Sequence, residues 1–174
     1  DIEKRIIFKW REDNTFKKQL EKNKDGQLYV FYDGPPFATG LPHYGHIVAS
    51  TIKDIVPRYW AMCGYNVPRR WGWDCHGLPI EFEIEKKLGI KTMEDILKLG
   101  IEKYNNACRS IVMNYSKEWK KTIERIGRWV DMENDYKTMD LSYMDMVWGI
   151  FGKLWDMNLI YQGVKVMPYS TGCT

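Results

Sequence analysis

A short apolar segment that runs into a loop of glycines and prolines constrains the fold of this chain most. Residues 28–32, Leu-Tyr-Val-Phe-Tyr, are rich in aromatic and β-branched side chains and predict a buried strand. Residues 33–42 contain two glycines and three prolines and predict a stiff loop. Apolar residues at helical spacing over 45–62 predict a helix, which Pro57 would interrupt or kink. Strand, loop and helix in this order begin a βαβ unit, so we expect an α/β fold with a parallel sheet.

Periodic apolar positions predict the remaining elements. We expect helices over 2–22, 80–88, 93–99, 101–125 and 143–158, a strand over 66–71, a strand-like run over 159–168 and a glycine-rich turn over 72–79. The chain divides into an N-terminal helical segment, residues 1–27, and an α/β domain, residues 28–174. Four tryptophans that lie in helical patterns are expected to pack in the core: Trp119, Trp129, Trp148 and Trp155.

Composition leaves most functional classes open. The length of 174 residues suits one well-buried domain, and an apolar share of 44% is ordinary for a globular protein. A net charge of +3 neither requires nor excludes a nucleic-acid partner. No apolar run approaches the ~20 residues of a membrane span. Free thiols in a reducing cytosol are expected for the four cysteines, which form no close pair: Cys63, Cys75, Cys108 and Cys173.

The first candidate site is the loop of residues 33–42 together with the two histidines that follow it. At the carboxyl end of a strand in an open α/β sheet, such a loop lies where ligands bind. A helix that begins there presents free N–H groups and a positive dipole end to a phosphate. His43 and His46 are three residues apart and would lie on one face, with Gly45 leaving room for a nucleotide. The alternatives are that both histidines cap the helix, or that they begin a metal site, which the lack of nearby carboxylates disfavours.

The second candidate site is the turn after the second strand. Asp74 lies between glycines at the end of that strand, where it could bind an ammonium group through a charge-assisted hydrogen bond. Alternatively, it caps the helix that begins near Pro79. The neighbours Cys75 and His76 suggest a metal site, but adjacent ligands without a second pair disfavour one.

The first site resembles the HIGH signature of the class I aminoacyl-tRNA synthetases. The run from Pro36 to His46 carries this resemblance, with Tyr44 where the family usually has isoleucine. The resemblance implies a Rossmann-like catalytic domain, of which residues 28–174 would be the first half, cut before the editing insertion. It also implies that ATP, with Mg²⁺, is bound by the segment Pro42, His43, Gly45 and His46. His43 and His46 would be catalytic, stabilising the transition state of adenylate formation by position and charge.

The second site resembles the Gly-Trp-Asp-Cys-His-Gly-Leu-Pro segment of the branch specific for isoleucine, valine, leucine and methionine. This resemblance implies that Asp74 holds the α-amino group of the amino acid, and that Gly34, Pro35 and Pro36 also bind it, with either proline on the side chain. Together with residues 104–109, the two sites resemble the isoleucine-specific family of the eukaryotic cytosol. That family implies a cytoplasmic ligase acting on L-isoleucine, ATP and tRNA(Ile), without a membrane. A leucyl or valyl relative and a non-catalytic nucleotide-binding fragment remain alternatives.

The end of the chain resembles the approach to the family's editing insertion. Residues 164–170 look like the strand before it, where bacterial relatives often carry a C-x-x-C zinc half-site. This chain has Ser170 and Cys173 at those positions, so zinc is doubtful. Residues 1–174 contain neither the family's KMSKS lysine loop nor its anticodon-binding domain, so we expect only part of an active site in a fragment of a longer protein.

Overall fold

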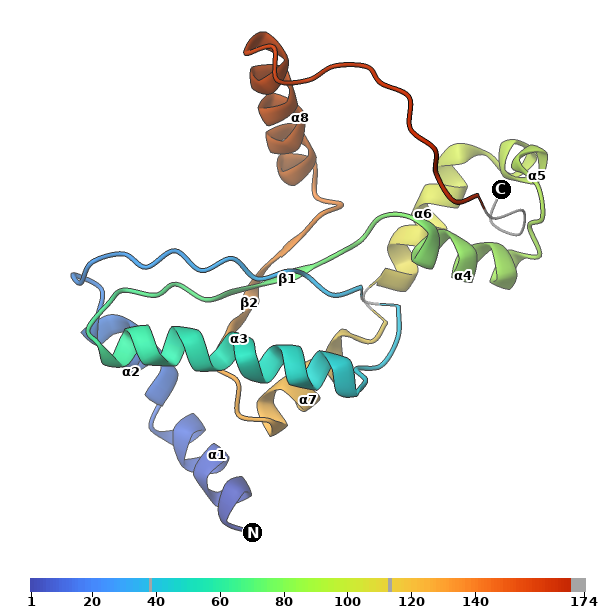
Figure 1. Ribbon diagram of the computed structural model, residues 1–174. Coiled ribbons are helices and arrows are strands. Elements are labelled where there is room, and N and C mark those ends of the chain that lie inside the picture. Colours follow the sequence, from blue (N-terminus) through green and yellow to red (C-terminus); the bar gives the residue numbers. More distant parts are fainter. Residues whose placement is uncertain (38, 113, 170–174) are drawn as a thin grey trace.

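A pair of parallel strands lies at the centre of the fold. The computed structural model describes residues 1–37, 39–112 and 114–169. β1 (Arg70–Trp73) pairs in parallel with β2 (Asp131–Lys137), and the register is irregular between Arg70 and Gly72. In Figure 1 the long helix α3 (Tyr44–Met62) runs along these strands. The predicted α/β fold with a parallel sheet is confirmed. The second strand begins at Arg70 and includes Gly72 and Trp73, which the sequence had placed in a turn.

The segment that precedes the first loop lies beside the chain that leads through β1. Two isolated parallel bridges join the two segments, one between Leu28 and Asn66 and the other between Phe37 and Asp74. Residues 29–36, between these two bridges, form no regular strand. The prediction of a hydrogen-bonded strand over 28–32 was therefore wrong. The chain is nevertheless extended there and runs parallel to β1 in Figure 1.

The two faces of this extended segment differ in burial. Tyr29 is half-buried and stacks on Trp60 of α3, with ring centroids 4.8 Å apart. Val30 and Tyr32, which alternate with it, are 60% and 90% exposed. Because successive side chains of an extended chain point to opposite faces, α3 covers one set and leaves the other open. The apolar composition of this segment predicted burial on both faces. The structure buries only one of them.

Two of the predicted helices are each divided in two. The first consists of α1 (Ile2–Glu12) and α2 (Thr15–Lys22), because Asn14 adopts a left-handed conformation with φ 50° that a helix cannot continue through. The second consists of α6 (Ile101–Val112) and α7 (Ser116–Arg125). α1 and α7 are joined by ion pairs between Arg11 and Glu124 and between Arg125 and Glu3. These predictions of single helices over 2–22 and 101–125 were wrong.

The other helices follow the sequence more closely. α3 continues through the buried Pro57, so this proline does not interrupt the helix. α4 (Leu78–Leu88) ends where Gly89 adopts a left-handed φ of 70°, and α5 (Met93–Leu99) begins with reciprocal hydrogen bonds between Thr92 and Asp95. α8 spans Leu141–Asp156. None of the helices in the described ranges is long and apolar enough to cross a membrane.

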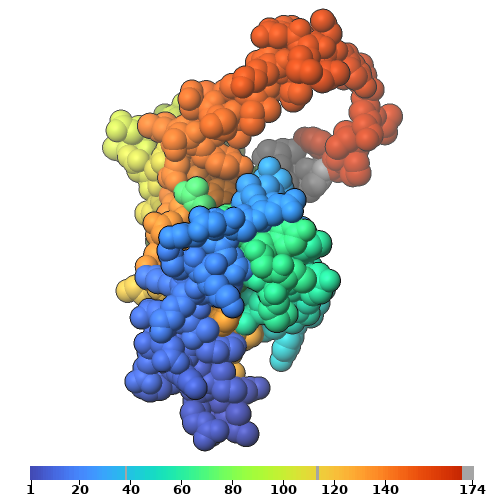
Figure 2. All heavy atoms as spheres, turned by 90° about the vertical axis from the view of Figure 1, so that its left-hand side faces the viewer, coloured from blue at the N-terminus to red at the C-terminus, as the bar shows by residue number. Residues whose placement is uncertain are grey.

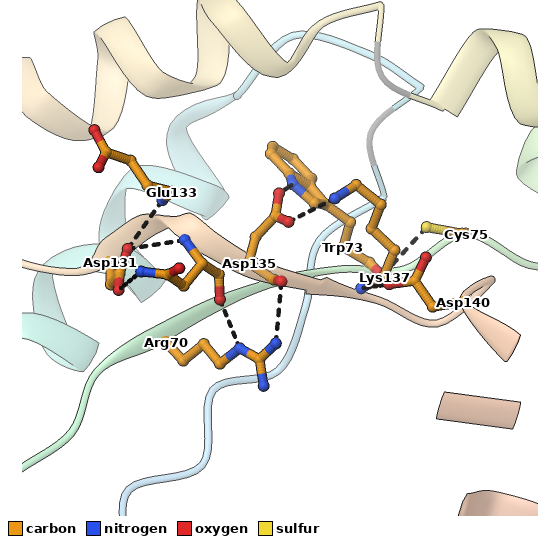
Figure 3. Close-up of polar contacts among 9 residues, drawn as sticks. Arg70, Trp73, Cys75, Asp131, Glu133, Asp135, Lys137 and Asp140 are labelled. Carbon is orange, nitrogen blue, oxygen red and sulfur yellow. Dashed lines mark hydrogen bonds and ion pairs between the residues drawn. The ribbon is translucent and has the colours of Figure 1, made fainter. Parts of the chain in front are cut away.

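The sequence patterns did not predict β2, which side-chain hydrogen bonds help to fix (Figure 3). Asp131 accepts hydrogen bonds from the backbone N–H groups of Glu133 and Asn134, each at 3.0 Å. Arg70 of β1 donates from Nε to the carbonyl oxygen of Asn134 at 2.6 Å. Asp135 accepts from the indole N–H of Trp73 at 2.8 Å. This strand is therefore held to β1 by polar groups in addition to its backbone pairing.

A core of tryptophan and aliphatic side chains packs between β1 and helices α4, α6 and α7. Its buried members are Trp71, Trp73, Cys75, Ile80, Val112, Trp119 and Ile123. Trp119 is 1% exposed, which confirms its prediction as a core residue. Trp129 is half-buried, with its ring 5.1 Å from that of Trp10 and the Arg58 guanidinium 4.0 Å above it.

Trp148 and Trp155 contradict the prediction that they pack in the core. Both lie on α8 and are 69% and 61% exposed. The first turn of α8 contacts β2, since Tyr143 stacks on Tyr136 with 5.7 Å between ring centroids. The rest of the helix extends away from the sheet in Figure 1 and stands off the body in Figure 2, so the described residues do not cover these rings. Residues 159–168 form no strand, so that prediction was wrong. Ser170 and Cys173 lie outside the described residues.

Candidate functional site

Two histidines occupy the beginning of α3. His43 is the N-cap residue, with extended backbone angles of φ −115° and ψ 175°. Its Nδ1 accepts a hydrogen bond from the N–H of Gly45 at 3.1 Å, and Nδ1 of His46 accepts one from the N–H of His43 at 3.2 Å. Both histidines therefore cap the helix, and whether they also bind a phosphate stays a prediction. Because both Nδ1 atoms accept, each neutral ring carries its proton on Nε2, which the capping does not use.

The two imidazoles lie against each other and against a buried indole. Their ring centroids are 3.7 Å apart, and the rings of His46 and Trp119 meet at 60°, with 4.8 Å between centroids. Burial lowers the pKa of His46 below its usual value, and the nearby His43 and Lys53 lower it further. His46 is thus held neutral near physiological pH, in the form that its cap to His43 requires.

Gly45 lies close against the ring of His43, two residues earlier. A Cβ atom at this position would lie 2.9 Å from Cε1 of the His43 ring, closer than carbon atoms tolerate. Any other residue would displace the imidazole and disturb its hydrogen bond to the backbone. The space beside Gly45 is taken by the His43 ring, and room for a nucleotide at this position stays a prediction.

A cleft of about 270 Å³ lies beside the second histidine. It is lined by the residues of the first loop, one face of α3 and two indoles: Asp33, Gly34, Pro35, Pro36, Phe37, His46, Ala49, Ser50, Lys53, Trp71, Trp119 and Arg128. The structure thus brings the predicted amino-acid loop, residues 34–36, to the same cleft as His46. Pro42, His43, Gly45 and Asp74 are not among the lining residues.

Asp74 is joined to the first loop through the backbone. Its N–H donates to the carbonyl oxygen of Pro36 at 2.9 Å, so the second turn lies directly against the proline loop. The alternative role as a helix cap is wrong, because Gly77 is the N-cap of α4 and makes no side-chain capping bond. One carboxylate oxygen of Asp74 lies 3.5 Å from the N–H of His76, a long contact that leaves the group able to accept from a ligand.

Cys75 and His76 have structural partners in the segment after β2. The N–H of Cys75 donates to Oγ1 of Thr138 at 2.8 Å, and Nε2 of His76 lies 2.8 Å from the carbonyl oxygen of Thr138. Burial raises the pKa of the Cys75 thiol. Within the described ranges, no group of three or more His, Cys, Asp or Glu side chains is arranged to hold a metal ion.

Sequence reasoning missed the charged residues of the cleft. Asp33 forms ion pairs with Lys53 and Arg128, which come from α3 and from the loop after α7. For Asp33, the sequence offered one indication, a carboxylate at the start of the loop. Arg128 is 95 residues away, and no local pattern in the sequence indicates that the two meet.

Comparison with known proteins identifies the family. Residues 5–174 match the family model "tRNA synthetases class I (I, L, M and V)". The cytoplasmic isoleucine–tRNA ligase of Arabidopsis thaliana is 60% identical over 171 residues, which cover 98% of this chain and 14% of that protein. The corresponding ligase of Mus musculus is 57% identical over the same shares, and that of Saccharomyces cerevisiae is 57% identical over 99% of this chain and 16% of its own length.

A solved structure shares the fold. The ternary complex of LeuRS, tRNA and LeuAMS from Agrobacterium radiobacter superimposes with a TM-score of 0.60 and 21% sequence identity, and the match covers 91% of this chain and 18% of that one. The chain thus spans less than one fifth of each of these relatives. Because the family model extends over nearly its whole length, the chain belongs to the class I tRNA synthetases of the isoleucine, leucine, methionine and valine branch.

Proposed function

We propose that the protein containing this chain is an isoleucine–tRNA ligase. In the first step, a carboxylate oxygen of L-isoleucine attacks the α-phosphorus of ATP and forms a new P–O bond. The bond to the pyrophosphate oxygen breaks, and its electron pair leaves with pyrophosphate. In the second step a hydroxyl oxygen of tRNA(Ile) attacks the carbonyl carbon of the adenylate and forms an ester, the bond from that carbon to the phosphate oxygen breaks, and AMP leaves with its electron pair while the hydroxyl gives up its proton. Relatives of 57–60% identity that carry the name isoleucine–tRNA ligase support this choice over a leucyl or valyl enzyme.

The observation that carries the proposal is the pair of histidines at the start of α3, beside the cleft that contains the proline loop. Capping uses Nδ1 of both rings and leaves Nε2–H as a donor on each. We assign these two donors, with Pro42 and Gly45 as the backbone around them, to the phosphates of ATP. Charge that moves onto phosphate oxygens in the transition state strengthens such hydrogen bonds. Mg²⁺ bound with ATP would neutralise part of the phosphate charge.

The amino acid is assigned to the other side of the cleft. Gly34, Pro35 and Pro36 line it, and the backbone hydrogen bond from Asp74 to Pro36 keeps the second turn close. The Asp74 carboxylate would accept from the ammonium group of isoleucine, and one of the two prolines would pack on its side chain. In this arrangement the carboxylate of isoleucine points toward the phosphates that His43 and His46 hold. The cytoplasmic relatives named above support a cytoplasmic location.

The test is amino-acid-dependent exchange of pyrophosphate into ATP by the full-length protein. We expect exchange with isoleucine, weaker exchange with valine and almost none with leucine. One methylene in an apolar pocket allows discrimination of ~10–200-fold, a general range for which isoleucyl enzymes are themselves a standard example. Preference for leucine or valine would transfer the assignment to that enzyme. ATP binding without exchange for any of the three would favour the non-catalytic alternative.

A further inference from the structure

The carboxylate of Asp33 is the centre of a buried charge cluster in the wall of the cleft. Its side chain is 9% exposed and its two oxygens bind different cations. Oδ1 lies 2.6 Å from Nζ of Lys53, and Oδ2 accepts a hydrogen bond from the guanidinium of Arg128, whose side chain is 4% exposed. The pair with Arg128 lies far from solvent, so it is weakly screened and holds its partners in a narrow geometry, whereas the Lys53 side chain is 29% exposed.

Other contacts fix the same cluster from several elements. Arg128 donates from Nη1 to Oγ of Ser50 at 3.3 Å, and its guanidinium lies 5.2 Å from the ring centre of Trp71. The main-chain oxygen of Asp33 accepts from the hydroxyl of Tyr136 in β2 at 3.2 Å. Asp33 is thereby tied to α3, to β2 and to the loop after α7. Of these elements, α3 and the loop after α7 also contribute residues that line the cleft.

The proline loop that follows Asp33 is held by hydrogen bonds from other parts of the chain. Pro35 and Pro36 have no N–H group, so the loop can donate few backbone hydrogen bonds of its own. One end is held by Lys53, which donates to the carbonyl oxygen of Gly34 at 2.9 Å while it binds Asp33. The other end is held where the carbonyl of Pro36 accepts from Asp74. The hydrogen bonds at Gly34 and at Pro36 therefore set the position of residues 34–36.

We propose that Asp33 is a positioning residue for the amino-acid loop, and that its ion pairs with Arg128 and Lys53 set where Gly34, Pro35 and Pro36 meet the substrate. Asp33 itself does not touch the reacting atoms. This inference rests on the proposed function, since it assigns the loop to the amino acid. It requires that loss of the carboxylate weakens use of isoleucine and leaves use of ATP nearly intact.

The first test is Asp33→Asn in the full-length protein, with pyrophosphate exchange measured against isoleucine and against ATP. We expect kcat/KM for isoleucine to fall by up to ~100-fold, through a higher KM for isoleucine, since a displacement of ~1 Å can cost this much, and the KM for ATP to change little. The matched control is Asp54→Asn. Asp54 forms a partly buried pair with Arg58 on α3, at 2.5 Å and with side chains 15% and 25% exposed, but is not among the residues that line the cleft. The control should lower the melting temperature and leave both KM values near wild type.

Asp33→Asn leaves Arg128 buried without a charged partner, so this variant is expected to lose stability. The double variant Asp33→Asn with Arg128→Met removes both charges and should recover stability without recovering the low KM for isoleucine. Lys53→Met removes the partly exposed cation and should raise the same KM by a smaller factor. An unchanged KM for isoleucine in whichever of these variants folds, with only the melting temperature lowered, would overturn the positioning role. Absence of isoleucine-dependent exchange in the wild type would instead refute the proposed function.

Discussion

The Trp119 indole packs against the imidazole of His46 at an angle of 60°, and the same indole holds the loop that precedes the histidine. The ring centroids are 4.8 Å apart, and Nε1–H donates to the carbonyl oxygen of Gly40 at 2.8 Å. Trp119 lies on α7, 73 positions after the histidine (119 − 46), and is almost fully buried. One core side chain therefore supports both the loop and the histidine assigned to ATP.

This relationship predicts a graded effect of substitution at Trp119. Trp119→Phe keeps an aromatic ring in the core but loses the donor to Gly40, so we expect slower adenylate formation with a modest loss of stability. Trp119→Ala removes a large buried side chain, which typically costs about 3–5 kcal/mol, and should destabilise the domain outright. Single-turnover adenylate formation and thermal unfolding of the full-length protein separate the two effects. A wild-type rate for the phenylalanine variant would show that the hydrogen bond to Gly40 has no part in catalysis.

His46→Ala is expected to slow adenylate formation while isoleucine binding stays close to wild type. Removal of one donor to transition-state charge typically raises a barrier by roughly 2.7–4 kcal/mol. His76→Ala serves as the control, because the His76 ring contacts the Thr138 carbonyl and does not line the cleft. Rapid-quench measurement of adenylate should show a large loss for the first variant only. Equal losses for both histidines would indicate that His46 acts through the fold.

The local features of the site were predictable because each is encoded within a few neighbouring residues. The loop of residues 33–42 ends at a histidine that starts a helix, and the turn with Asp74 follows directly on a strand. The two ends of the proline loop could not be predicted in the same way. The partner of Asp33 at one end is Arg128, which only the folded chain brings near.

The wrong predictions of the fold also arise from contacts or conformations that local sequence patterns do not encode. β2 has few strand-forming residues, and its conformation depends on hydrogen bonds such as those from Arg70 to the carbonyl of Asn134, which no periodic pattern reveals. The left-handed conformation of Asn14 breaks a helix whose apolar spacing continues across it. Trp148 occupies a helical pattern typical of a core residue, but the described part of the chain provides nothing to cover it. Apolar periodicity predicts which face of a helix would be buried, but it does not predict whether another segment packs against that face.

Asp74→Asn is expected to weaken isoleucine binding far more than ATP binding. The ammonium group would lose a charged acceptor, and hydrogen bonds to charged groups are worth about 1.5–3 kcal/mol, more than neutral ones. The backbone hydrogen bond from residue 74 to Pro36 is kept by this substitution, so the loop itself should stay in place. Equilibrium titrations of the full-length protein with each ligand measure the two affinities. Parallel loss of both would mean that the carboxylate supports the turn and does not bind the substrate.

The lowered pKa of His46 predicts a specific dependence of stability on pH. Its causes are burial first, and then the proximity of His43 and Lys53. In the unfolded chain this histidine takes up a proton as the pH falls through its ordinary value of about 6.5, whereas the folded chain resists protonation there. The unfolded state then binds more protons, so folding stability decreases as the pH falls below that value, and His46 contributes no such change well above it. Protonation would also remove the Nδ1 acceptor that caps His43.

We therefore expect His46→Gln to flatten the fall in stability between about pH 7.5 and about pH 5.5. The measurement is urea unfolding of the 174-residue chain at both pH values, followed by two probes to verify a single transition. All other titratable groups are common to both proteins, so the difference between wild type and variant isolates the histidine. Proton NMR of the chain, which has three histidines, gives an independent check, because the Cε1 proton resonance missing from the variant should titrate with a midpoint below about 6.5 in the wild type. A midpoint at or above that value, or an equal loss of stability in both proteins, would mean that the ring is not held neutral against Trp119.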